Sequence, residues 1–197
     1  MSTVTRSLTY EEWLQMPPVE DGRDEVVKGE LRYMPPNHYP HAEIIQLLIE
    51  AILPQIDSRR VRILGSDFGL LISRDPLTCR SPDLAVYQRD RIVIKDGLYL
   101  APPDLIVEID IFSPSSRRID IYKQLGVPEI WRYTGGSVQI YRLQDGEYVP
   151  SDRSPSFPLV SAIVINQFLQ QAETQDDTTF IRTWRQWVRQ QVSSEPA

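Results

Sequence analysis

The stretch Leu105-Ile-Val-Glu-Ile-Asp110 decides the fold and the candidate site. It is apolar except for two carboxylates, and a short apolar run of this length is typical of a buried β-strand. Since residues two apart on a strand share a face, Glu108 and Asp110 project together, while residues 105, 107 and 109 project to the other side. Carboxylates within an apolar strand cost free energy unless something compensates, and a divalent metal ion is the usual partner of several converging carboxylates.

A second acidic position precedes another expected strand, in Ser81-Pro-Asp-Leu-Ala-Val-Tyr87. Asp83, Glu108 and Asp110 together predict a site for metal-assisted hydrolysis that binds Mg²⁺ or Mn²⁺ through oxygen ligands. The alternative is that Asp83 caps a turn after Pro82 and that Glu108 pairs with an arginine. Spacing alone favours neither interpretation, because many α/β proteins carry an aspartate at the end of a strand.

Composition places the chain among ordinary globular proteins and excludes several classes. The 197 residues are 41% hydrophobic and 24% charged, which favours one domain over residues 1–197 and a cytoplasmic location without a membrane span. The net charge of −6 argues against a broadly basic nucleic-acid binder but leaves room for a local basic groove. The single cysteine, Cys79, excludes an internal disulfide and a cysteine zinc cluster, so we expect it to be a small, at least half-buried residue.

Hydrophobic periodicity and turn residues predict an α/β fold, a mixed β-sheet flanked by helices. The core spans about 10–150, and a C-terminal helical extension spans about 158–192. A hairpin over 24–34 turns near Lys28-Gly29, and residues 92–100 form a connection with little regular structure. The helices are expected over residues 9–16, 40–56, 118–125, 161–171 and 177–191, and the other strands over 61–66, 69–73, 83–87, 105–111, 129–133, 139–143 and 147–149.

Several short segments, in this order and spacing, together resemble the Uma-two family of restriction-endonuclease-like proteins, within the PD-(D/E)xK nuclease superfamily. The resemblance covers roughly residues 10 to 145. It implies the restriction-endonuclease-like fold, a divalent metal and DNA as the substrate. The segments that carry it are Glu25–Leu31, His41 at the start of a helix, Ser81–Tyr87, Pro103–Ile109 and Gly126–Trp131.

The chain departs from the nuclease pattern two residues after Glu108, where lysine is expected and Asp110 stands. A lysine there would orient the attacking water and stabilise developing charge, whereas Asp110 can instead add a carboxylate to the metal. Neighbouring helices sometimes supply the missing cation, and here the candidates are Arg117, Arg118 and Lys123. Arginine remains protonated, so it can clamp phosphate but is a poor general base. Lys123 is chemically better suited but points in a different direction on the helix from Arg118, so we favour Arg118 as a phosphate clamp.

Two further residues enter the site through the resemblance. His41 lies on the apolar stripe of its helix and can act as a proton shuttle, although a satisfied core histidine is the alternative. Glu25 can serve as an additional acidic metal ligand from the hairpin, although an ordinary exposed strand residue is the alternative.

These observations lead to a magnesium-dependent endonuclease that hydrolyses DNA, with Asp83, Glu108, Asp110, Arg118 and His41 as its catalytic residues. A homodimer is expected, because two equivalent sites serve the cutting of two strands. The main alternative is a catalytically impaired nuclease-fold protein that binds nucleic acid or another protein, and a hydrolase of another phosphate ester is the third interpretation. The arginine-bearing C-terminal helix is expected to pack on the domain or across the dimer.

Overall fold

The computed structural model describes residues 7–36, 39–57, 59–66, 68–111 and 116–194. Within these residues, the α-helices are α1 (Tyr10–Leu14), α2 (Tyr39–Ile52), α3 (Ser116–Leu125), α4 (Ala162–Ala172) and α5 (Asp177–Ser194), and the 3₁₀ helices are η1 (Leu53–Gln55) and η2 (Arg89–Arg91). The strands are β1 (Arg23–Val27), β2 (Glu30–Met34), β3 (Val61–Gly65), β4 (Leu70–Arg74), β5 (Leu77–Arg80), β6 (Leu84–Gln88), β7 (Ile94–Lys95), β8 (Leu98–Tyr99), β9 (Leu105–Asp110), β10 (Glu129–Thr134), β11 (Ser137–Gln144) and β12 (Glu147–Ser151).

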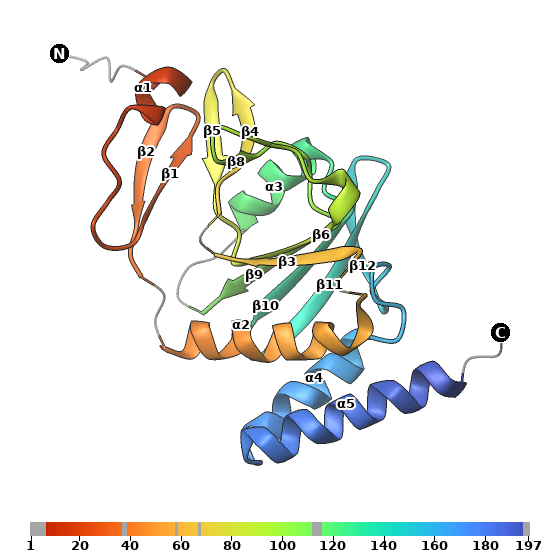
Figure 1. The fold of residues 1–197 in the computed structure, drawn as a ribbon. Coiled ribbons are helices and arrows are strands. Elements are labelled where there is room, and N and C mark those ends of the chain that lie inside the picture. The colour runs from red at the N-terminus through yellow and green to blue at the C-terminus, as the bar shows by residue number, and fades with distance from the viewer. Residues whose placement is uncertain (1–6, 37–38, 58, 67, 112–115, 195–197) are drawn as a thin grey trace.

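The described strands form two six-stranded sheets with helices packed around them (Figure 1). The first sheet has the order β2-β1-β5-β4-β8-β7, and the second has the order β12-β11-β10-β9-β6-β3. The α/β class with flanking helices is confirmed, but the strands are divided between two sheets where one mixed sheet was expected. The pattern of apolar residues identifies strands without identifying their neighbours, which is why the division could not be read from it.

The strand that carries the two carboxylates lies inside the second sheet. β6 runs antiparallel to β9, with Leu84 opposite Val107, and β10 runs parallel to β9, with Ile130 opposite Ile106. Parallel neighbours need a long crossover, and α3 is the helix in that connection. The β9–α3–β10 unit therefore brings the face of β9 that bears Ile106 and Glu108 against α3.

The two faces of β9 are buried against different parts of the protein, as its alternation predicts. Ile106 packs in a cluster with Tyr122 of α3. The opposite face packs in a larger cluster with residues of α2, α4 and α5; its members on β9 are Leu105, Val107 and Ile109.

The first sheet begins with the hairpin β1–β2, whose turn is at Lys28 and Gly29 as predicted. Both residues have positive φ, 52° and 77°, the turn geometry that matches the twist of a two-residue hairpin. β1 also pairs with β5, where Val26 lies opposite Cys79. Cys79 is 3% exposed, which confirms the small buried role expected for it.

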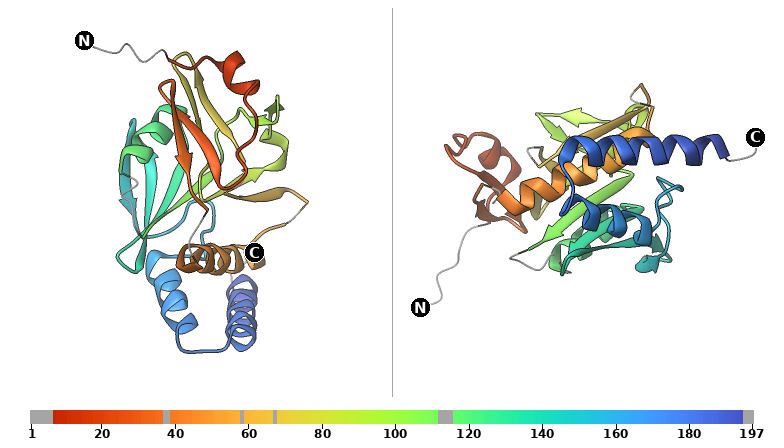
Figure 2. Two further views of the ribbon diagram at one scale, coloured as in Figure 1. Left: turned by 90° about the vertical axis from the view of Figure 1, so that its left-hand side faces the viewer. Right: turned by 90° about the horizontal axis from the view of Figure 1, so that it is seen from below.

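The two C-terminal helices pack below the second sheet, beside α2 (Figures 1 and 2). The rings of Phe168 in α4 and Trp184 in α5 lie 4.3 Å apart, and Trp184 Nε1 donates a hydrogen bond of 3.2 Å to the carbonyl of Ala51. The structure thus shows α5 packed on its own chain, the first of the two arrangements expected for it.

Two local expectations need correction. The α-helix expected to reach residue 56 ends at Ile52 and continues as a short 3₁₀ helix, because Pro54 has no N–H to donate to the preceding turn. Residues 92–100 were expected to be irregular, but β7 and β8 pair there in a small hairpin, with a turn at Asp96-Gly97. In the part of the chain that the structure describes, no helix is both long and apolar enough to cross a bilayer.

Candidate active site

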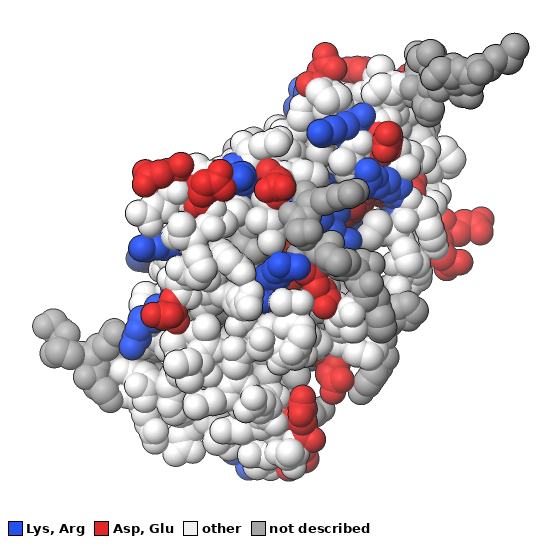
Figure 3. Space-filling view, turned by 180° about the vertical axis from the view of Figure 1, so that it is seen from behind, with Lys and Arg blue, Asp and Glu red and all other residues white. Residues whose placement is uncertain are grey.

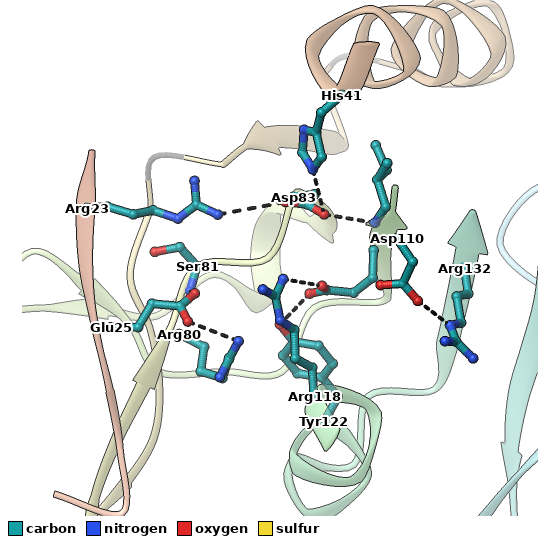
Figure 4. A network of polar contacts seen from close by, with 12 residues as sticks. Arg23, Glu25, His41, Arg80, Ser81, Asp83, Asp110, Arg118, Tyr122 and Arg132 are labelled. Carbon is teal, nitrogen blue, oxygen red and sulfur yellow. Dashed lines mark hydrogen bonds and ion pairs between the residues drawn. The ribbon is translucent and has the colours of Figure 1, made fainter. Parts of the chain in front are cut away.

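Asp83 lies in the short connection that leaves β5 of the first sheet and enters β6 of the second. Its side chain is 2% exposed. Asp83 Oδ2 accepts a 2.8 Å hydrogen bond from the backbone N–H of Ile109 and lies 3.2 Å from His41 Nε2. Arg23 of β1 approaches the other oxygen at 3.8 Å (Figure 4). The backbone bond to Ile109 joins the two acidic segments and replaces the turn cap considered for Asp83.

Glu108 is fully buried and is held by two residues of α3. Its Oε2 accepts a 2.8 Å hydrogen bond from Arg118 Nη1, and its Oε1 accepts a 2.6 Å bond from the hydroxyl of Tyr122 (Figure 4). Burial and the nearby charge of Asp83 raise the pKa of Glu108 to about 7, although Arg118 and Tyr122 act in the opposite direction. The pairing of Glu108 with an arginine, one of the alternatives from the sequence, is therefore present.

Helix α3 presents Arg118 and Tyr122 together because residues four apart lie on one face of a helix. Burial alone would lower the pKa of Arg118, but Glu108 raises it above its usual value, so the guanidinium stays charged. Burial raises the pKa of Tyr122 far above its usual range, so its hydroxyl remains a donor. Lys123 contacts Glu147 at 2.9 Å instead.

Arg118, and not Lys123, is therefore the cation of α3 that pairs with Glu108, while its role as a phosphate clamp stays a prediction. The side chain of Arg117, the third candidate, lies outside the described residues.

Asp110 shares the face of β9 with Glu108 but has its own partner. Arg132 Nε donates a 2.6 Å hydrogen bond to Asp110 Oδ2, and their side chains are 22% and 5% exposed. Arg132 comes from β10, the parallel neighbour of β9. A positive charge therefore reaches the position where the nuclease pattern expects lysine, but from the next strand.

Glu25 is 1% exposed, so the alternative of an ordinary exposed strand residue is wrong. Its Oε1 accepts a 3.0 Å hydrogen bond from the backbone N–H of Ser81, and its Oε2 lies 2.9 Å from Arg80 Nη2. The carboxylate is buried because β1 pairs with β5, which ends at Arg80. A role of Glu25 as a metal ligand stays a prediction.

The sequence did not single out Tyr122, Arg132 or Arg23. Tyr122 follows Arg118 by one helical turn, which is a usable signal once Arg118 is chosen. Arg132 and Arg23 approach through sheet pairing and the packing of the two sheets, for which the sequence gives no spacing rule.

The donor chemistry near Asp83 and Glu108 suits a divalent cation. The charge of Asp83 raises the pKa of Glu108, and a cation held by both carboxylates would relieve this repulsion. Among the residues with described positions, however, no three His, Cys, Asp or Glu side chains are arranged to hold a metal. Each oxygen of Glu108 already accepts one hydrogen bond from α3, so an ion there would use the remaining lone pairs or displace Arg118 or Tyr122.

Comparison with known proteins identifies the family. Residues 10–171 match the model of the Uma2 family, described as "Putative restriction endonuclease". This chain belongs to the Uma2 family. The match extends past the range of about 10 to 145 expected from the sequence motifs and covers all but the last residue of α4. Every candidate site residue lies inside it.

The Uma2 fold of this chain is similar to a solved structure. A putative nuclease belonging to DUF820, from Anabaena variabilis ATCC 29413, superposes with a TM-score of 0.64 at 21% sequence identity. The alignment covers 82% of this chain and 99% of the other, which confirms the fold. No curated protein matches the chain.

Proposed function

We propose that this Uma2-family protein is a metal-dependent endodeoxyribonuclease that hydrolyses phosphodiester bonds in DNA. The observation that carries the proposal is the convergence of Asp83 and Glu108, two buried carboxylates so close that the charge of one raises the pKa of the other. Burying such a pair is costly unless a proton or a cation compensates, and sites of this kind are often functional. Membership of a family described as putative restriction endonucleases supports the same conclusion.

Asp83 and Glu108 would hold Mg²⁺ or Mn²⁺, with Asp110 and Glu25 as further ligands that remain predictions. When bound, such an ion polarises a phosphoryl oxygen and lowers the pKa of a water molecule. In the reaction, the oxygen of water forms a bond to phosphorus while the bond from phosphorus to the leaving oxygen breaks. The water loses a proton, and the leaving oxygen gains one.

Two side chains beside the carboxylates suit the remaining tasks. Arg118 keeps its charge and presents a planar set of donors that matches phosphate oxygens, so it neutralises the phosphate on which water acts. His41 contacts Asp83 through Nε2, while its Nδ1 is buried and has no hydrogen-bond partner among the described residues. His41 can therefore relay a proton at Nδ1 while Asp83 fixes its orientation.

A catalytically impaired nuclease-fold protein is the second candidate, and one contact favours it. Asp110 stands in place of lysine and is neutralised by Arg132, so β9 itself offers no cation to the attacking water. Such a protein would bind nucleic acid without cleaving it.

The test measures cleavage of single-stranded and duplex DNA by the full chain with Mg²⁺, with Mn²⁺ and with a chelator. The variants are Asp83→Asn and Glu108→Gln, with Glu43→Gln as a matched control, because Glu43 is an exposed carboxylate of α2. We expect metal-dependent cleavage in the wild type and the control, and its loss in both site variants.

Each other result decides between the candidates. Metal binding measured by calorimetry, without cleavage, supports the catalytically impaired protein, whereas cleavage that persists in both site variants contradicts an active site at Asp83 and Glu108.

Cutting of duplex DNA also needs one site for each strand, and we propose a homodimer that supplies both. Sedimentation equilibrium of the wild type checks this assembly.

A further inference from the structure

A cavity lies next to the candidate active site. It has a volume of about 550 Å³ and is bordered by the β1–β2 hairpin, by β4 and β5, and by α3. This is the size of many small-ligand sites. The described residues that line the cavity include four cationic and two acidic side chains: Lys28, Arg32, Arg80, Arg118, Glu25 and Asp120. The excess of positive charge is notable in a chain whose net charge is −6.

The inner wall of the cavity holds a buried cation with a spare donor. The side chain of Arg80 is 5% exposed, and its Nη2 lies 2.9 Å from Glu25. Arg80 Nε has no hydrogen-bond partner in the described part of the chain. A buried donor without a partner costs free energy, and an oxyanion in the cavity would satisfy it.

The outer wall of the cavity carries two exposed cations on the hairpin. Lys28 sits in the turn with φ of 52°, and its ammonium forms no ion pair with any residue whose position is described. Arg32 has a side chain that is 47% exposed and lies 3.5 Å from Glu30, a weak contact in water. Both side chains can therefore turn to an anion without losing a strong bond.

Arg118 joins this cavity to the carboxylates. It lines the cavity and at the same time donates a 2.8 Å hydrogen bond to Glu108. On the face shown in Figure 3, blue and red side chains are interspersed over the upper part of the molecule, while the lower part carries few charges. Because Arg118 borders the cavity and also bonds Glu108, an anion in the cavity would lie beside the position proposed for the reacting phosphate.

We propose that this cavity binds a backbone phosphate of the nucleic-acid strand, next to the phosphate that is cleaved. The inference rests on the proposed function, because it takes the strand to pass Glu108. Arg80 would hold this phosphate within the cavity, Arg118 would lie between it and the cleaved phosphate, and Lys28 and Arg32 would neutralise it from the rim. Contacts of this kind position a strand without reading its sequence.

The test measures DNA binding in the presence of a chelator, so that no metal-dependent cleavage takes place. Affinities of the full chain for a labelled single-stranded oligonucleotide and its duplex are determined over a series of salt concentrations. The test variant is Lys28→Gln with Arg32→Gln, and the matched control is Arg59→Gln with Lys95→Gln, which removes the same charge from exposed positions outside the cavity. Thermal unfolding confirms that both double variants fold.

We expect the cavity variant to bind DNA more weakly and to lower the slope of log affinity against log salt by about 1 for each phosphate that the protein no longer neutralises. The control should keep the wild-type slope. Equal slopes in the wild type and the cavity variant, or equal losses in both double variants, would overturn the proposal. Competition with inorganic phosphate distinguishes the two sources of the anion. If free phosphate displaces DNA at concentrations close to the dissociation constant for DNA, the cavity is a site for free phosphate and not for a strand.

This binding test is independent of the cleavage test. If Asp83→Asn and Glu108→Gln abolish cleavage but the cavity variant keeps the wild-type salt slope, only the phosphate subsite is contradicted. A protein that never cleaves DNA but shows the expected slope difference contradicts the proposed nuclease activity and keeps the subsite.

Discussion

Arg132 Nε lies 2.6 Å from Asp110 Oδ2, although the residue aligned with Arg132 in the parallel pairing of β9 and β10 is Glu108. The guanidinium thus bonds to the carboxylate two residues further along β9 and leaves Glu108 to Arg118 of α3. Each carboxylate on this face of β9 consequently has its own arginine. The two ion pairs offset the cost of placing both charges on one buried strand.

The Asp110–Arg132 pair should contribute to stability, since the Asp110 side chain is only 5% exposed. We expect Asp110→Ala to destabilise the protein by about 1–3 kcal/mol, because Arg132 loses its partner. A double-mutant cycle with Arg132→Ala, followed by urea unfolding, should give a coupling of about 0.5–3 kcal/mol. The exposed pair Arg32–Glu30 is the control and should give less than about 1 kcal/mol. Equal coupling energies for the two pairs would show that burial does not strengthen the contact.

The raised pKa of Glu108 predicts how stability changes with pH. Folding raises this pKa from 4.5 to about 7, so the folded state holds the proton more tightly. The contribution of protonated Glu108 to the stability of the folded protein is fully present below about pH 4.5 and is lost as the pH rises through about 7. With a chelator present, the free energy of unfolding of the wild type minus that of Glu108→Gln should therefore fall between these two pH values, by at most about 1.4 kcal/mol per pH unit. Parallel pH profiles of the two proteins would contradict the raised pKa.

Tyr122→Phe should destabilise the protein by about 1–3 kcal/mol. The substitution removes the hydroxyl that donates to Glu108 Oε1 and leaves a buried carboxylate oxygen without that bond. Losing this donor should also raise the pKa of Glu108 further. Tyr33→Phe is the matched control: Tyr33 is 54% exposed, and the change should stay within about 0.5 kcal/mol. Chemical denaturation checks both variants, and equal effects would show that the bond to Glu108 is unimportant.

Cys79 should be inert toward thiol reagents in the folded protein. Burial, with the charge of Glu25 adding to it, raises the pKa of Cys79 to about 12, so little thiolate forms at mildly alkaline pH. Because the chain contains one cysteine, a disulfide reagent that releases a coloured thiol reports on this residue alone. We expect slow labelling in buffer and rapid labelling in denaturant. Rapid labelling without denaturant would mean that the sheet opens readily around β5.

The sequence predicted the elements and one face of the site well, because both depend on local periodicity. Alternation along β9 correctly separated Glu108 and Asp110 from their aliphatic neighbours, and turn residues located the hairpin at Lys28. Helix spacing placed His41 on the stripe of α2 that reaches Asp83. All of these signals lie within a few residues of the feature that they predict.

The parts that were missed depend on contacts between distant segments. Glu25 is buried because β1 pairs with β5, about 50 residues later in the chain, and its own segment carries no trace of that pairing. Arg132 reaches Asp110 through a parallel register that no local pattern sets. The Asp96-Gly97 turn, by contrast, is a known hairpin signal, and it predicts β7 and β8 when it is given weight.

The connection from β5 to β6 has a consequence for how this protein can vary. Residues 81–83 form one of the connections between the two sheets, and Asp83 is bonded there to the backbone of β9. An insertion or deletion in this connection would break the bond from Asp83 to the backbone of β9 and so move Asp83 away from Glu108. The same three residues that connect the two sheets therefore also set the spacing of the two carboxylates.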